Sequence, residues 1–224
     1  MKTALQVTAS SVVGLVLMGL ALFWPAGTLD YWQAWVFLGV FVVLSAVYTV
    51  YVGIKSPEVL RRRMHAGPTA ETRPVQKVVS SGVVLMFFAL LVVSAFDHRF
   101  GLSTVPTAMV VIGDVLVAVG LGISMLVVVQ NSYAAASITV EAEQKVVSTG
   151  LYGFVRHPMY FGGLIMMVGI PLALDSYFGL VVVVPIVFLL AVRIVDEEKA
   201  LTDGLAGYRE YIQKVHARLV PHVW

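Results

Sequence analysis

YWQAWVFLGVFVVLSAVYTVYVGI, residues 31–54, is a mostly apolar run without one charged side chain. An α-helix rises about 1.5 Å per residue, so about 20 such residues cross the roughly 30 Å hydrocarbon core of a bilayer. The run therefore predicts a membrane-spanning helix. The 224-residue chain as a whole is 59% hydrophobic and 12% charged, whereas soluble domains carry about 25% charged residues. This composition argues against a water-soluble fold.

Five further runs of the same kind lie on either side, at residues 4–24, 75–96, 105–130, 158–174 and 177–195. The last two are near the short limit for a full crossing. A tight turn at Asp175-Ser176 joins these two into a predicted helical hairpin. The sequence thus predicts an all-α fold, a polytopic transmembrane helical bundle of about six spans.

The basic residues predict the orientation of these spans, because cytoplasmic loops retain Lys and Arg. Six spans place both termini on one side of the membrane. With that side cytoplasmic, fourteen of the fifteen Lys and Arg residues fall inside and only Arg99 falls outside. We therefore expect a multi-pass protein with both termini in the cytoplasm.

The C-terminal region turns polar after Val195, yet apolar residues recur there at spacings of four and three. This spacing is typical of one face of a helix. A helix this polar cannot span, so we expect a C-terminal cytoplasmic amphipathic helix that lies against the interface or packs on the other helix ends. Its apolar face comprises Leu201, Leu205, Tyr208, Ile212, Val215 and Leu219.

The start of the fifth span carries a cationic and a titratable side chain. Pro158 suits the first helical turn, where its missing N–H group leaves no hydrogen bond unmade. Arg156 and His157 then stand at a helix N-terminus, a favourable place for a carboxylate or phosphate. The plainer alternative is an interfacial arginine beside a helix cap.

The end of the sixth span is acidic. Asp196, Glu197 and Glu198 follow the last apolar residues, so three acids crowd a predicted helix C-terminus, where the macrodipole disfavours negative charge. Arg193 lies one turn before Glu197 and can pair with it. Asp196 is expected to face water, and an ordinary solvated helix end is the alternative interpretation.

The predicted hairpin makes these two segments neighbours. Arg, His and two Glu residues at a membrane surface can bind a zwitterionic ligand, its anion by Arg and His and its ammonium by the carboxylates. Tyrosines offer aromatic faces for a base or a cation. The chain has no cysteine, which excludes disulfides and a cysteine nucleophile. No metal site and no nucleic-acid partner are predicted. The tyrosines are Tyr152, Tyr160, Tyr208 and Tyr211.

Residues 131–224 resemble the isoprenylcysteine carboxyl methyltransferase and phospholipid methyltransferase family of integral membrane enzymes. The resemblance rests on motifs in a fixed order. They are Gly150-Leu151-Tyr152, the run VRHPMY at 155–160, Arg193 followed by Glu197-Glu198, Gly207-Tyr208 with Tyr211, and Arg218-Leu219-Val220-Pro221.

The resemblance implies an enzyme that uses S-adenosyl-L-methionine at the cytoplasmic helix ends and a lipophilic acceptor from the bilayer. It implies that residues 131–224 form the cofactor-binding and catalytic region, while residues 1–130 form the acceptor-side scaffold. Arg193 and Glu197 are implied to lie nearest the reacting groups. The implied cofactor contacts are Tyr152, Arg156, His157, Tyr160 and Glu198.

The acceptor stays open at this point. A prenylated-cysteine-like carboxylate needs no base and can be held by Arg193, whereas a lipid amine or thiol needs a proton removed by Glu197 or His157. Two other functions also remain: an NADPH-dependent membrane reductase of the sterol or enone type, and a non-catalytic lipid-binding protein. Asp114, deep in the fourth span, is expected to pair within the bundle or to line a cavity.

Overall fold

The structure is a computed structural model that describes all residues except 1, 65–66, 72, 135–143 and 222. The described residues form eight α-helices and one short 3-10 helix, and no strand occurs among them. The elements are α1 (Lys2–Ala26), α2 (Trp32–Lys55), α3 (Pro57–Met64), α4 (Pro74–Phe100), α5 (Thr107–Gln130), η1 (Gly150–Gly153), α6 (Pro158–Ala173), α7 (Gly179–Gly204) and α8 (Tyr208–Lys214).

Each of the six predicted spans corresponds to one apolar helix, and five of these helices are long. In the described residues, α1, α2, α4, α5 and α7 are long and apolar enough to cross a membrane, and α6 is a shorter apolar helix of 16 residues. The prediction of an all-α, multi-pass membrane protein is confirmed.

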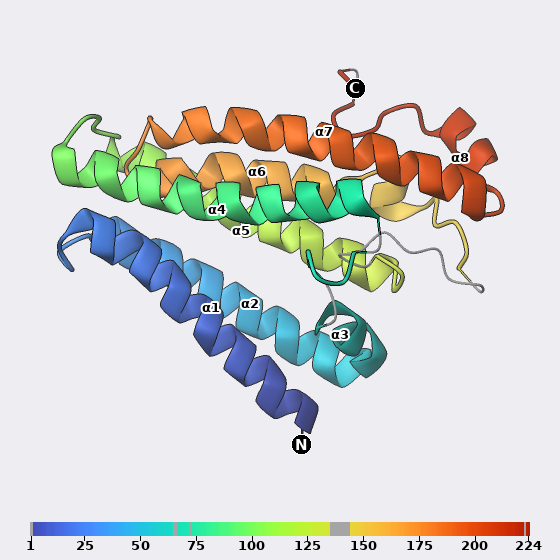
Figure 1. Cartoon of the computed structure of the whole chain (residues 1–224), viewed down its shortest axis with the longest axis horizontal. Coiled ribbons are helices and arrows are strands. Elements are labelled where there is room, and N and C mark those ends of the chain that lie inside the picture. The colour runs from blue at the N-terminus through green and yellow to red at the C-terminus, as the bar shows by residue number, and fades with distance from the viewer. Residues whose placement is uncertain (1, 65–66, 72, 135–143, 222) are drawn as a thin grey trace.

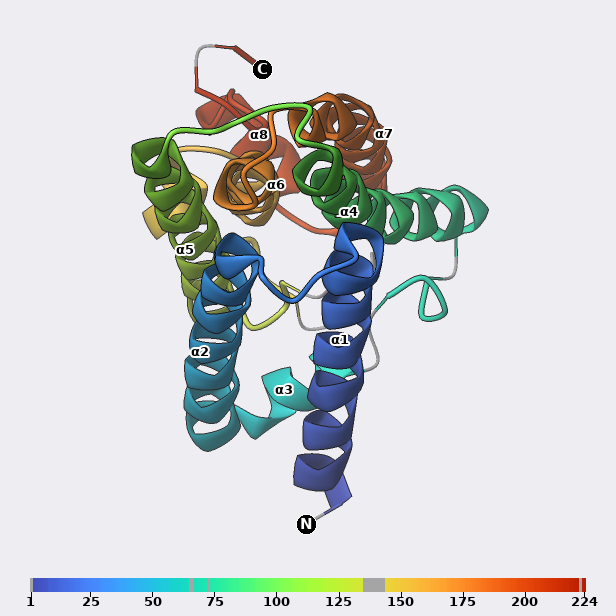
Figure 2. The same ribbon diagram turned by 90° about the vertical axis from the view of Figure 1, so that its left-hand side faces the viewer.

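The apolar helices pack against one another in pairs. α5 lies along α6 and α4 lies along α7, while α1 contacts α4 and α2 contacts α5. Figure 1 shows α4, α6 and α7 running side by side. Figures 1 and 2 show that α1 and α2 lean away from that group toward the N-terminus.

The contact between α5 and α6 is a contact between backbones. A Cβ atom on Gly120 would lie 2.4 Å from the carbonyl oxygen of Gly162, and one on Gly169 would lie 2.7 Å from that of Gly113. Small residues permit such close approach of membrane helices. This tight antiparallel contact holds the start of α6, where Arg156 and His157 stand, against the end of α5.

The turn between α6 and α7 is fixed by hydrogen bonds to distant helices. The Asp97 carboxylate accepts a hydrogen bond from Ser176 Oγ at 2.6 Å, and Asp175 accepts one from the Val105 N–H at 2.6 Å. The Tyr31 hydroxyl donates to the Leu174 carbonyl at 2.5 Å. The predicted hairpin is therefore present, and it returns α7 to the end of the bundle at which α6 begins.

Two predictions for the C-terminal region need correction. α7 continues to Gly204, so Asp196 to Glu198 lie inside a helix and not at its C-terminus. The predicted amphipathic helix is divided, because Gly207 adopts a φ of 82° and separates α7 from the seven-residue α8. Most of its apolar face still forms one cluster, in which Leu205, Tyr208, Tyr211 and Val215 are buried and Leu201, Ile212, Val146 and Tyr152 pack against them.

Asp114 is buried in α5 with 8% exposure. Its Oδ1 atom has no hydrogen-bond partner among the described residues. It lines neither of the two cavities described below.

Gly120→Ala is expected to lower the free energy of unfolding by about 2–3 kcal/mol, because the new Cβ would meet backbone atoms of α6 that cannot move aside cheaply. Gly122→Ala, two residues along the same helix, is the matched control, because its Cβ would meet nothing within 4 Å. Thermal unfolding in detergent measures both. Equal stability of the two variants would contradict the backbone contact.

Candidate functional site

The start of α6 is held by the C-terminal segment. The backbone N–H groups of Arg156 and His157 donate to the carbonyls of Ala217 and Arg218, both at 2.9 Å. Pro158 occupies the first turn of α6, as predicted. Arg156 and His157 are both buried, so their side chains project into the protein and not into the interface.

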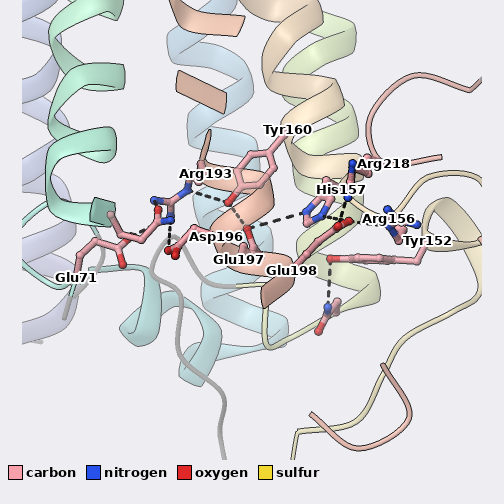
Figure 3. A network of polar contacts seen from close by, with 12 residues as sticks. Glu71, Tyr152, Arg156, His157, Tyr160, Arg193, Asp196, Glu197, Glu198 and Arg218 are labelled. Atoms are coloured by element: carbon pink, nitrogen blue, oxygen red, sulfur yellow. Dashed lines mark hydrogen bonds and ion pairs between the residues drawn. The ribbon is translucent and has the colours of Figure 1, made fainter. Parts of the chain in front are cut away.

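The Glu198 carboxylate contacts two arginines and a histidine (Figure 3). Its Oε1 accepts a hydrogen bond from Arg156 Nε at 2.7 Å and lies 3.2 Å from His157 Nε2, while its Oε2 accepts one from Arg218 Nε at 2.9 Å. The guanidinium of Arg156 also donates to the carbonyl of Val215 at 2.9 Å. Glu198 thereby ties α7 to α6 and to the C-terminal segment.

Arg193, one turn earlier on α7, has a different set of partners. Its Nε donates to the Tyr160 hydroxyl at 2.8 Å, its Nη1 to Gln76 Oε1 at 2.9 Å, and its Nη2 to Glu71 Oε1 at 2.9 Å. Figure 3 shows these groups side by side at one edge of the network. Arg193 therefore links α7 to α6, to α4 and to the loop before α4.

Tyr160 connects the two halves of the network. Its hydroxyl accepts from Arg193 and donates to Glu197 Oε2 at 2.6 Å, and His157 Nδ1 lies 4.0 Å from the same oxygen. The Tyr160 hydroxyl thus lies between Arg193 and Glu197, the two residues that the sequence suggested could pair. Polar contacts run without a break from Glu71 to Arg218 (Figure 3).

A cavity opens beside this network. Of the predicted site residues, Tyr152, Arg156, His157, Tyr160 and Glu197 line it, and Arg193 and Glu198 do not. Glu197 is the most accessible acid of the cluster, with 23% of its side chain exposed. The remaining wall includes Asn131, Gln144, Lys145, Met159, Tyr208 and Tyr211.

Three phenols in the cavity wall, those of Tyr152, Tyr208 and Tyr211, stay protonated at neutral pH. Burial raises the pKa of Tyr152 to about 12, although the hydrogen bond from Asn131 opposes this shift and the Glu197 charge adds to it. Burial is also the main cause that raises the pKa of Tyr208 and of Tyr211. These residues offer neutral aromatic faces and hydroxyl groups to a ligand.

Sequence reasoning missed the contribution of the region around the start of α4. Asp196 was expected to face water, but it pairs with Arg73 and accepts a hydrogen bond from Gln76 Nε2 at 2.6 Å. That expectation is wrong, because α7 passes beside α4 at this level. The one available signal was Glu71, the only acid between the end of α3 at Met64 and the start of α4 at Pro74.

The described residues contain no cluster of three or more His, Asp or Glu side chains suited to a metal ion. The arrangement instead offers one accessible carboxylate, neutral phenols and partly engaged cations around a small cavity. Such a set can bind a polar or zwitterionic molecule and can accept a proton.

Comparison with known proteins gives one family. A family model described as phospholipid methyltransferase matches residues 108–207, which run from α5 to the end of α7. No curated protein matches the chain. The members of this family are S-adenosylmethionine-dependent membrane methyltransferases that act on lipid-type acceptors. The predicted resemblance, enzyme class and cofactor are therefore confirmed.

Glu198→Gln is expected to lower the free energy of unfolding by about 3 kcal/mol, because it removes the counter-charge of the buried Arg156 and of the partly exposed Arg218. Glu197→Gln changes the next residue of the same helix and is expected to cost about 1 kcal/mol or less, since that side chain is partly exposed. Thermal unfolding of the two detergent-purified variants makes the comparison. Similar losses in both would refute the central role of Glu198.

Proposed function

We propose that this membrane protein, whose residues 108–207 carry a phospholipid methyltransferase domain, transfers a methyl group from S-adenosylmethionine to the amine of a membrane lipid. One observation carries the choice of acceptor. Of the two charged groups that contact the Tyr160 hydroxyl, the Glu197 carboxylate lines the cavity and is 23% exposed, whereas the Arg193 guanidinium is buried and directed at protein partners.

The possible acceptors differ in the protein groups that their methylation requires. A carboxylate acceptor needs a cation that can hold it, but Arg193 has 7% of its side chain exposed and donates to Glu71, Gln76 and Tyr160. An amine acceptor arrives as an ammonium and must lose a proton before it can react. Glu197 is placed to attract the ammonium and to take that proton. A thiol shares the second requirement, and the family description favours the amine.

S-adenosylmethionine, when bound, supplies a methyl group activated by its sulfonium. The bound cofactor would supply this methyl group to the lipid nitrogen, with its C–S bond broken as the N–C bond forms and S-adenosylhomocysteine as the product. Glu197 accepts the proton that the ammonium loses, and the Tyr160 hydroxyl, which donates to Glu197, holds the carboxylate in place. Alignment and exclusion of water are the remaining contributions of the protein.

The residues around the cavity fit the cofactor in chemistry. We assign Tyr152, Arg156, His157 and Tyr160 as cofactor contacts, with the phenols against the base and the sulfonium and with Arg156 and His157 near the carboxylate. Glu198 acts on the cofactor through the two residues it holds. The cavity measures about 90 Å³, less than the roughly 300–1,000 Å³ of small-molecule sites, so binding requires its wall to move outward.

Residues 1–130 are assigned to the acceptor side. An apolar groove of about 650 Å³ lies between α1, α2 and α4, with Met18, Phe41 and Phe87 among its lining. Met18 belongs to the buried apolar core against which Tyr160 packs, and Phe41 and Phe87 pack against the same core. The groove is therefore proposed to hold the hydrocarbon tail of the lipid acceptor.

The site end of the bundle is proposed to face the cytoplasm, together with both termini. Arg99 lies at the opposite end, where it donates to the carbonyl of Pro25 at 3.3 Å. Most other basic residues precede α4 or follow α7, on the side of the site. The bias of Lys and Arg toward cytoplasmic loops supports this orientation.

Glu197→Gln is expected to lower kcat for methylation of phosphatidylethanolamine about 10²–10⁴-fold, because the general base is lost, while S-adenosylhomocysteine still binds. Transfer of labelled methyl groups and calorimetric titration give the two readings. Glu210→Gln, an exposed acid in α8, is the control. Undiminished transfer by Glu197→Gln, or transfer by the wild-type protein only to a prenylated cysteine, would overturn the amine assignment.

Ser45→Phe is expected to raise KM for the lipid acceptor several-fold without changing S-adenosylhomocysteine affinity, because the ring would fill the groove between α1 and α2. Val47→Phe is the matched control, since Val47 is exposed on the same helix and does not line the groove. Steady-state kinetics in lipid nanodiscs measures both variants. An equal KM for the two would argue against the groove as the tail site.

A further inference from the structure

Glu71 lies in the loop before α4, outside the region that matches the family. It is 2% exposed. A carboxylate is seldom buried this fully unless it is paired. Its partner is Arg193, at 2.9 Å, and this contact joins residues 122 positions apart in the chain. A loop of the N-terminal half therefore reaches the candidate active site.

The contacts of Arg193 fix the orientation of its guanidinium group. Glu71 and Gln76 accept from its two terminal nitrogens, and Tyr160 accepts from Nε. A guanidinium is planar and rigid, so three acceptors in different directions leave it no free rotation. Of these acceptors Glu71 alone carries a full negative charge, and its bond is the strongest kind available to Arg193.

This orientation decides which way the Tyr160 hydroxyl points. A hydroxyl has one proton to donate. Because Arg193 Nε donates to the Tyr160 oxygen, the Tyr160 proton is directed at Glu197, 2.6 Å away. A rotated Arg193 would leave that proton undirected and Glu197 free to turn.

We propose that Glu71 is a positioning residue for methyl transfer, which acts on Glu197 through Arg193 and Tyr160. This inference rests on the proposed function, because Glu197 is its endpoint. Glu71 does not line the cavity, so its effect must travel through the residues between. The activity of the C-terminal motifs then depends on one residue from the N-terminal half.

A purely structural role for Glu71 would be to hold α4 against α7. The same junction is also held by Arg73 and Gln76, which both contact Asp196. Arg73 pairs with Asp196, and among the described residues it makes no hydrogen bond or ion pair with Arg193 or Tyr160. It therefore separates the two roles, since its loss weakens the junction and leaves the path to Glu197 in place.

The test is a double-mutant cycle on the full-length protein in nanodiscs with phosphatidylethanolamine. Glu71→Gln and Tyr160→Phe are each expected to lower kcat about 10–100-fold, and the double variant is expected to resemble Tyr160→Phe alone. S-adenosylhomocysteine affinity of Glu71→Gln should stay within about threefold of wild type. Arg73→Gln should lower Tm with kcat nearly unchanged.

The inference is overturned if Glu71→Gln keeps its kcat, if its effect adds fully to that of Tyr160→Phe, or if Arg73→Gln loses kcat to the same extent. A wrong choice of acceptor can be distinguished from a wrong role for Glu71. If another lipid is methylated instead, the same cycle on that lipid still decides the role of Glu71. If Glu197→Gln stays active while the cycle is non-additive, Glu197 is not the base and Glu71 still positions Tyr160.

Discussion

The buried carboxylate of Glu198 is the interaction on which the arrangement of the site depends. Removing a carboxylate from water is costly unless other polar groups replace the water. Here the guanidinium groups of Arg156 and Arg218 and a ring nitrogen of His157 surround it. These groups belong to the start of α6 and to the C-terminal segment. Neither segment is held in place by its own helix hydrogen bonds, so satisfying one charge on α7 brings them together over the cavity.

Three consecutive acids on α7 meet three different parts of the molecule. Successive residues on an α-helix point about 100° apart, so Asp196 turns toward α4, Glu197 toward Tyr160 and the cavity, and Glu198 toward the C-terminal segment. Three different faces of α7 thus contribute to the site. A single accessible carboxylate remains at the cavity because its two neighbours are neutralised by the protein.

The spans and the candidate residues followed from local features of the sequence. A charge-free run such as residues 31–54 is expected to lie in the bilayer whatever its neighbours are. It must be helical there, because backbone N–H and C=O groups without hydrogen-bond partners cost too much free energy in hydrocarbon. Pro158 likewise marks a helix start by its own covalent geometry. The C-terminal helix was less predictable, because its apolar spacing continues through Gly207, where the backbone adopts φ of 82° and the helix breaks.

The sequence alone determined that this protein is a helical membrane protein, and its motifs pointed to the residues at one end of the bundle. Only the tertiary structure decided which charge meets which. Arg193 was expected to pair with Glu197, its neighbour on the helix, yet its guanidinium reaches Glu71, 122 positions away. The physical reason is that apolar length and turn geometry act locally, whereas the partner of a buried charge is set by whichever helices pack beside it.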